Sequence, residues 1–277
     1  MSIVSETTAD AVASTSIHRH HHVGPLARVQ RFLLGSALPW LALGVGLLVW
    51  EAVGQAGWYT FLPPFSGVLG AFSDLITSGR IWAIRLTLES LAMGFGLSLV
   101  LGMVTGIAMA RSALLEYVLD PWVDAFMTIP SSALIPLYLI LFGLGTETRV
   151  VIVFMHAYFV VVINTLAGAR AVDAHLIEMA RAFGAREGEI IRKIVLPSAL
   201  PLVLTGIRLG FGRAVRGIIN GETILASVGI GQLLIRYGRS FQMESLYAVV
   251  LTIVIMAVIG TTLVGYLEKR LTRWQKA

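Results

Sequence analysis

The sequence contains no cysteine and is poor in charged residues. The absence of cysteine excludes disulfides, thiolate chemistry and cysteine-based metal sites. Charged residues make up 13% of the 277 positions and hydrophobic residues 56%, whereas a soluble domain carries about 25% charged residues. A chain with so little charge cannot cover a water-facing surface, so we expect a lipid bilayer to be its solvent.

Motifs of nucleotide hydrolysis and of common hydrolases are also missing. The sequence has no Walker-type phosphate loop, no Gly-x-Ser-x-Gly elbow and no His-Glu-x-x-His pair. His156 and His175 are isolated and lack the spacing of metal ligands. An intramembrane enzyme would need a paired acid/base or metal constellation, and none stands out. We therefore expect a chain that is not an enzyme, hydrolyses no ATP and binds no cofactor or metal of its own.

Six segments are apolar over the length of about 20 residues that a membrane-spanning helix needs. They cover residues 37–53, 86–110, 122–144, 150–169, 200–225 and 246–267. A further segment, 61–76, contains two prolines followed by a one-sided apolar pattern, which predicts an interfacial helix instead of a span. The fold class expected is an all-α membrane protein.

One domain is expected from residue 37 to residue 277, because no long polar gap separates the apolar segments. Residues 1–36 are polar and weakly patterned, which predicts a disordered cytosolic tail. The histidine-rich tract at 18–22 has no carboxylate cluster beside it, so metal binding there has no support and no function is assigned to it.

The basic residues are unevenly placed along the chain, whose net charge is +5. Most lie before the first span, between the fourth and fifth spans, and after the sixth. Lys and Arg accumulate on the cytoplasmic side of membrane proteins, so both termini are predicted to be cytoplasmic. The same placement explains the basic pI of about 9.8 through an anionic membrane surface, without nucleic acid.

The segment 173–198, between the fourth and fifth spans, is the longest charged stretch between spans. Its first half has apolar residues at helical spacing and stops at Gly184, and a second short helix is expected to end at Pro197. Two short helices joined by a turn are therefore predicted to project from the membrane. The pattern alone also fits an amphipathic loop that lies on lipid headgroups. The apolar face of the first helix consists of Leu176, Met179, Ala180 and Phe183.

The spacing within this segment resembles the EAA motif of the permeases of ABC importers. That motif reads Glu-Ala-Ala, three residues, Gly, nine residues, Ile, one residue, Leu-Pro. The matching residues here are Glu178, Met179, Ala180, Gly184, Ile194, Leu196 and Pro197. The one departure is methionine at the second position. The resemblance implies that these residues couple the chain to a separate ATPase, with Glu178 as a polar contact or cap and not as a catalytic base.

The resemblance extends over most of the chain after residue 36. LPPFSGVLGAF (62–72), IPSSALIPLYLILFGLG (129–145) and residues 221–234 resemble the sulfonate, taurine and nitrate importer permeases. This branch implies the type I ABC importer permease fold, a multi-pass place in the bacterial inner membrane, and transport of a small anion. An aromatic carboxylate or a vitamin precursor remains an alternative substrate. The implied partners are ATPase subunits that hold ATP and Mg, an extracytoplasmic substrate-binding protein, a second permease copy and membrane lipid.

Three arginines and one glutamate lie within the fifth span. Three interpretations are open for Arg208, Arg213 and Arg216. The side chains reach the cytosolic end and snorkel to water, or they line the translocation path and attract an anion. The third interpretation is packing at a subunit interface. Arg213, Arg216 and Glu222 are our preferred path residues. Glu222 would then act as a counter-ion or as part of a gate.

Pro130 and Pro136 interrupt the third span. They produce either a tolerated kink or a break whose freed backbone groups line a cavity, as in discontinuous transporter helices. The second interpretation adds both prolines to the predicted path. A self-powered secondary transporter would instead show an internal sequence repeat, and we find none in this sequence.

Overall fold

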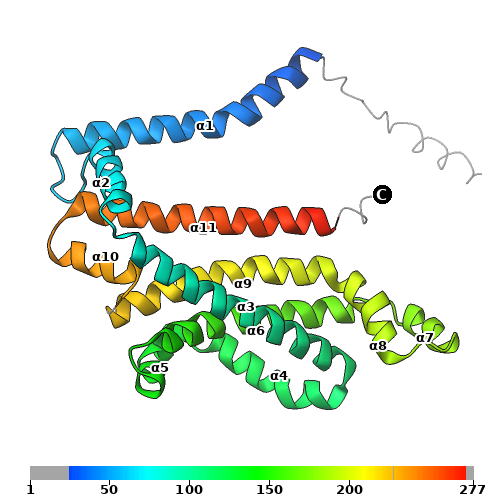
Figure 1. Cartoon of the computed structure of the whole chain (residues 1–277). Coiled ribbons are helices and arrows are strands. Elements are labelled where there is room, and N and C mark those ends of the chain that lie inside the picture. Colours follow the sequence, from blue (N-terminus) through cyan, green and yellow to red (C-terminus); the bar gives the residue numbers. More distant parts are fainter. Residues whose placement is uncertain (1–24, 227, 273–277) are drawn as a thin grey trace, which may run out of the picture.

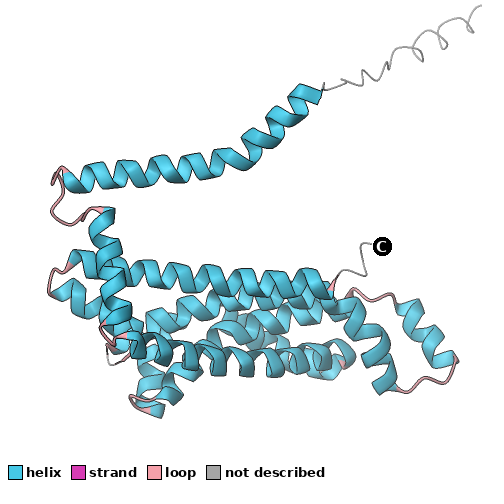
Figure 2. Cartoon of the chain, turned by 45° about the horizontal axis from the view of Figure 1, so that its top comes forward, coloured by secondary structure: helices cyan, strands magenta, loops and turns pink. Residues whose placement is uncertain are grey.

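The computed structural model describes residues 25–226 and 228–272, which form helices and short connections with no strand among them (Figures 1 and 2). The predicted all-α class is confirmed. The α-helices are α1 Pro25–Gln55, α2 Phe65–Thr77, α3 Ile81–Arg111, α4 Ala113–Thr128, α5 Ile135–Phe142, α6 Thr146–Arg170, α7 Ala174–Ala182, α8 Glu187–Ile190, α9 Leu196–Leu225, α10 Ile230–Arg239 and α11 Met243–Leu271. A 3₁₀ turn, η1 (Ser131–Leu134), precedes α5, and a π-helical turn, η2 (Ile191–Val195), joins α8 to α9.

Helix α6 lies between α3 and α9, and glycines on both neighbours allow the close approach. A Cβ atom at Gly102 of α3 would lie 2.9 Å from the side chain of Val161. A Cβ atom at Gly217 of α9 would lie 2.5 Å from the ring of His156. Small residues are the usual means by which membrane helices pack closely, since the bilayer offers no hydrophobic driving force between helices. The three helices therefore form the packed centre that holds His156 against α9.

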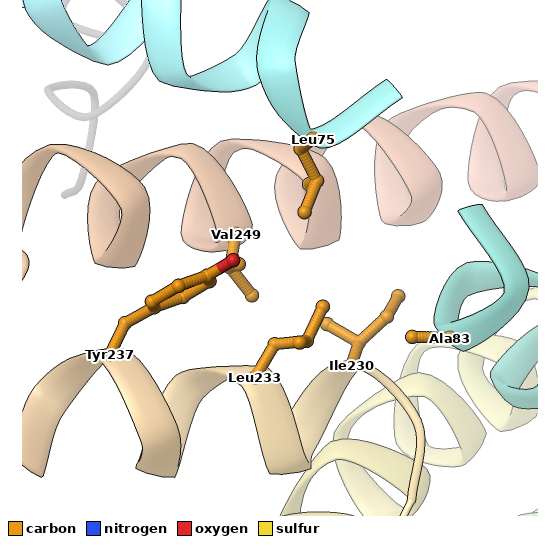
Figure 3. Close-up of a cluster of buried hydrophobic side chains, with 6 residues drawn as sticks. All are labelled: Leu75, Ala83, Ile230, Leu233, Tyr237 and Val249. Atoms are coloured by element: carbon orange, nitrogen blue, oxygen red, sulfur yellow. The ribbon is translucent and has the colours of Figure 1, made fainter. Parts of the chain in front are cut away.

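A second cluster of buried side chains closes one end of the bundle (Figure 3). Its members are Leu75 from α2, Ala83 from α3, Ile230, Leu233 and Tyr237 from α10, and Val249 from α11. Helix α2 corresponds to the predicted interfacial segment, and it buries Val68 and Leu75 within the protein. The hydroxyl of Tyr237 accepts a hydrogen bond of 2.5 Å from Nη1 of Arg80. The cluster thus ties α2 and α10 to the spanning helices.

Within residues 25–226 and 228–272, five helices are long and apolar enough to cross a membrane, and α4 with α5 makes a sixth span if this bent pair counts as one. The third span, predicted over 122–144 with interruptions at Pro130 and Pro136, begins earlier than predicted, because α4 starts at Ala113; the predicted interruption is present, since the pair is bent by 94°. A proline disfavours the α-conformation in the residue before it. Accordingly Ile129, before Pro130, is extended at φ −65° and ψ 131°. Pro136 lies in the first turn of α5, where a missing N–H group costs nothing.

The predicted helix end at Pro197 is wrong. α8, η2 and α9 form one helical run of 39 residues, Glu187–Leu225, and Pro197 lies in the first turn of α9. We attribute this to the wider π-turn before it, which relieves the clash between a proline ring and the preceding turn. A run of this length measures about 58 Å, and the hydrocarbon core only about 30 Å. One end of it therefore projects beyond the bilayer.

The two ends of the described chain lie towards the same end of the molecule as α7 and α8 (Figure 1). This arrangement agrees with the predicted even number of spans, and the cytoplasmic assignment stays a prediction. Residues 25–36, expected in a disordered tail, form the first turns of α1, and the histidine-rich tract lies outside the described residues. Helix α1 runs apart from the bundle (Figure 2), and its segment Leu38–Gln55 contains no buried residue.

Candidate functional site

The predicted EAA segment forms a compact pair of helices outside the bundle. Helix α7 ends in a Schellman motif: the N–H of Ala185 donates to the carbonyl of Ala180 (3.0 Å) and the N–H of Gly184 to that of Arg181 (2.9 Å). Gly184 has φ +80°, in the left-handed region that favours glycine. The predicted glycine stop is confirmed, and it reverses the chain into α8.

The predicted apolar face of α7 is divided between the inside and the outside of the loop. Ala180 packs inward, with Ile177 and Ile194, against a buried cluster. That cluster consists of Ala169, Val172, Ile190 and Val195. Met179 and Phe183 point outward, with exposed fractions of 51% and 85%. The small side chain of Ala180 therefore serves packing within the loop, and the bulkier residues form its outer surface.

The polar member of the motif, Glu178, lies near this surface, and two apolar members lie at the start of α9. Glu178 is exposed, with Oε2 at 3.9 Å from Nδ1 of His175. Leu196 and Pro197 lie at the start of α9, where they continue the helix into the span. The motif thus comprises an outward part on α7 and an inward part that joins α7 to α9.

An ion-pair network fixes the loop to the spanning helices. The carboxylate of Glu187 accepts hydrogen bonds from Nη2 of Arg111 at the end of α3 (2.5 Å) and from Nη2 of Arg181 on α7 (2.7 Å). Arg170, at the end of α6, pairs with Glu116 of α4. Exposed ion pairs add little stability singly, but Glu187 joins the ends of α3 and α7 to the start of α8, and Ala169 at the end of α6 packs in the loop's buried cluster. We infer that the loop follows any movement of α3, α6 and α9.

A polar pocket of about 330 Å³ lies beside α9 on the bundle. It is lined by Ser131, Ser132, His156, Arg213, Arg216 and Asn220. Three of these residues come from α9 at spacings of three and four, which places them on one face of that helix. The two serines come from the break between α4 and α5, and the histidine from α6.

The donors around this pocket are largely free. Nε of Arg216 donates to the carbonyl of Gly212 in its own helix (3.1 Å), and Nη1 of Arg213 lies 3.7 Å from the sulfur of Met127. Over residues 25–226 and 228–272, no carboxylate lies within 4.0 Å of the guanidinium of Arg213 or Arg216. The pocket therefore carries unneutralised positive charge. In the same part of the chain, no group of three His, Asp or Glu could hold a metal ion.

Glu222, the third predicted path residue on α9, lies apart from this pocket. Its side chain is 0% exposed, and its carboxylate accepts hydrogen bonds from Oγ1 of Thr87 (2.8 and 2.9 Å) and from the N–H of Gly231 (3.0 Å). Nη1 of Arg149, a residue only 4% exposed, lies 3.9 Å from Oε1. Glu222 thus ties α9 to α3, α6 and α10.

The structure brings together the predicted residues Arg213 and Arg216 and sets beside them the break that Pro130 makes. Sequence reasoning missed the four other lining residues. Asn220 follows Arg213 by seven residues, so the helical period could have placed it on the same face. Ser131, Ser132 and His156 carried no comparable signal, because their positions depend on packing between distant segments.

Comparison with known proteins identifies the class. Residues 98–273 match the family of binding-protein-dependent transport system inner membrane components. The chain belongs to this family. It is similar to SsuC of Bacillus subtilis (strain 168), whose name assigns it to aliphatic sulfonate transport, with 31% identity over 83% of this chain and 85% of that protein. It is also similar to the riboflavin transport system permease RibX of Chloroflexus aurantiacus, with 31% identity over 91% and 96%.

Among solved structures, an inward-facing MetNI methionine ABC transporter has a chain with a TM-score of 0.56, covering 70% of this chain and 96% of its own length, at 24% identity. This likeness supports the fold. The chain is therefore a multi-pass inner-membrane permease component of an ABC importer, as the sequence predicted. Membership in this family implies an ATPase and a substrate-binding protein as partners.

Proposed function

We propose that the chain imports a small anion and that the segment 173–198 couples it to ATPase subunits in the cytoplasm. The observation that carries this proposal is the continuity of the loop with the spans. α8 runs without a break into α9, and Glu187 joins the loop to the ends of α3 and α7. A partner that pushes on α7 would therefore move α9 and, through Arg111, α3.

The outward surface of α7 is suited to docking. Leu176, Met179 and Phe183 are exposed although they are apolar, and they lie outside the apolar spans. Exposed apolar residues grouped at a projecting tip are typical of an interaction site. Ala180 and Gly184 shape the loop behind this surface, and Glu178 supplies a polar contact at its edge. We infer that a groove on the ATPase receives Phe183.

Two copies of the chain would form the pathway. Helix α1 is apolar and runs apart from the bundle (Figure 1), which leaves it available to lipid or to a second copy. Two copies would bind two ATPase subunits, where ATP and Mg are held, and one substrate-binding protein on the outer face. Closure of the ATPase pair would switch the spans between inward-open and outward-open states. The chain itself binds no nucleotide in this scheme.

An aliphatic sulfonate, taurine or nitrate is the substrate class that we propose. The relationship to a permease named for aliphatic sulfonates supports it. A vitamin such as riboflavin is the second candidate, because a permease named for riboflavin is equally similar in identity. The two candidate substrates differ in charge, so the charge of the side chains that line the pathway distinguishes between them.

Co-purification with the cognate ATPase tests the docking assignment. We expect Phe183→Glu to abolish association with the ATPase and ATP-driven uptake. Phe241→Glu is the matched control, since Phe241 is also exposed (70%) and its turn lies at the opposite end of the molecule from α7 (Figure 1). It should retain ATPase association. Equal association of the ATPase with both variants would show that α7 is not the docking site.

A further inference from the structure

The pocket lined by Ser131, Ser132, His156, Arg213, Arg216 and Asn220 lies away from the ends of the spanning helices α6 and α9 that line it. His156 follows the start of α6 by ten residues, which places it about 15 Å along a helix with a rise of 1.5 Å per residue. Arg213 lies in the interior of α9, far from both of its ends. This depth separates the pocket from the lipid headgroups at either surface.

Two guanidiniums at this depth cannot face hydrocarbon without a large cost, so residues of this kind face a watery cavity or a partner. Arg213 and Arg216 are nevertheless exposed on the surface of the single chain. Neither has a carboxylate within reach in the described parts of the chain. We conclude that this face of α9 borders the aqueous pathway.

The pocket offers hydrogen-bond donors suited to an anion. Arg216 is oriented by its bond to the carbonyl of Gly212, which leaves both terminal nitrogens free. Arg213 has only the long contact to the sulfur of Met127. A guanidinium presents a planar fork of N–H donors that matches the oxygens of a sulfonate or carboxylate.

The neutral groups of the pocket add further donors around the arginines. Nδ2 of Asn220 donates to Oγ of Ser132 over 3.4 Å, a long and easily exchanged hydrogen bond. Nδ1 of His156 donates to the carbonyl of Ile152 (2.7 Å), since a carbonyl only accepts, so Nε2 of the neutral ring is an acceptor and His156 shapes the pocket wall without donating to an anion. These groups come from α9, η1 and α6, so one small ligand would contact all three elements.

We propose that this pocket binds the oxyanion headgroup of the transported solute, a sulfonate or carboxylate, during its passage through the membrane. Arg213 and Arg216 hold the headgroup oxygens, and Ser132 and Asn220 complete the donor set. The volume of about 330 Å³ lies at the small end of ligand pockets, which fits a headgroup with a short chain. This proposal rests on the proposed import function and adds the place where the substrate's charge is met.

The test measures binding of ethanesulfonate and propionate to the full-length chain in phosphatidylcholine nanodiscs. Saturation-transfer difference NMR is suited to this measurement, because it detects weak binding and a site on a transport pathway binds its solute weakly. We expect saturable binding of both anions and none of tetraethylammonium. Arg213→Gln and Arg216→Gln should each weaken binding by roughly tenfold or more, the effect of losing a charge-assisted hydrogen bond. Arg213→Lys should weaken it less, because the charge remains.

Arg208→Gln is the matched control. Arg208 lies on the same helix and is exposed, but it pairs with Glu268 (3.8 Å) and does not line the pocket. Its variant should bind both anions as the unchanged chain does. Equal binding by the Arg213, Arg216 and Arg208 variants would overturn the proposal, as would saturable binding of tetraethylammonium.

A second arm separates the solute from a lipid phosphate, which shares the same chemistry. Ethanesulfonate binding is compared in nanodiscs with and without phosphatidylglycerol. Unchanged binding supports the solute as the occupant. Competitive loss of binding in the anionic nanodiscs would assign the pocket to a lipid headgroup and overturn the proposal. The NMR experiment contains no ATPase, so its failure is distinguishable from failure of the docking assignment, which the Phe183 and Phe241 variants report.

Discussion

The buried pair of Glu222 and Arg149 makes the sharpest prediction about stability. Glu222 is 0% exposed and Arg149 4% exposed, and their closest atoms lie 3.9 Å apart. Nε and Nη1 of Arg149 are buried without a hydrogen-bond partner, so the carboxylate is the compensating charge. Glu222→Leu would leave the arginine uncompensated. Breaking a buried ion pair in this way costs about 3–5 kcal/mol.

Replacing both partners should restore most of the lost stability. An apolar pair of similar volume is often neutral relative to a buried ion pair. We therefore expect Arg149→Met with Glu222→Leu to be more stable than Glu222→Leu alone. Thr87 and Gly231 still lose an acceptor in the double variant. Some destabilisation, about 1–3 kcal/mol for an unsatisfied buried donor, should therefore remain.

The assay is the half-life of the folded, monodisperse protein in detergent at a fixed elevated temperature. Membrane proteins commonly unfold irreversibly, so a rate is the appropriate measure. If the substitution lowers the activation free energy of unfolding by about 3 kcal/mol, the half-life falls by roughly a hundredfold. Glu89→Gln, which removes an exposed partner of Arg85, should leave the half-life unchanged. A double variant no more stable than Glu222→Leu would refute the reasoning, because Arg149 would then not be the group left uncompensated.

Two further predictions concern glycines. Gly102→Leu should shorten the half-life strongly, because its Cβ would lie 2.9 Å from Val161 and overpacking costs about 1–3 kcal/mol. Gly96→Leu is the control and should leave the half-life unchanged, because nothing lies within 4 Å of a Cβ at that position. Gly184→Val should abolish ATP-driven uptake while the chain still inserts, because a β-branched residue is strained at φ +80°. Gly57→Val is its control, because Gly57 has φ +66° and equally open surroundings, and the connection from α1 to α2 that contains it lies at the opposite end of the molecule from α7 (Figure 1). Equal uptake by the two valine variants would count against a special role for the loop.

The features that the sequence predicts well are those set by neighbouring residues. Spans follow from long apolar runs, and the described part of the chain holds five or six of them. The stop at Gly184 follows from the conformational freedom of glycine, and the structure places it at φ +80°. The break at Pro130 follows from the steric effect of a proline ring on Ile129, although the sequence did not give the bend of 94°. Each of these outcomes depends on only a few consecutive residues.

The features that the sequence could not give depend on distant segments. Arg149 lies directly before the fourth predicted span, yet it is buried against Glu222, which comes three helices later in the chain. Pro197 looked like a helix end, but the π-turn before it lets the helix continue. Ala180 shares its predicted apolar face with Met179 and Phe183, which are exposed, but the chain folds back at Gly184 and covers Ala180. In each case, packing between elements decided the outcome against the local pattern.

One continuous helical run connects the docking loop to the polar pocket, and this explains how one could act on the other. The helical run Glu187–Leu225 begins in the docking loop and carries Arg213 and Arg216 about 40 Å further along. An α-helix is stiff along its axis, so a displacement of its first turns reaches the arginines unless the helix bends. The π-turn Ile191–Val195 is the one irregular step in this run, and Ile194 and Val195 pack in the loop cluster there. Movement of the loop would therefore shift the positive face of α9 relative to the break at Ser131, which changes the pocket itself and not only its access.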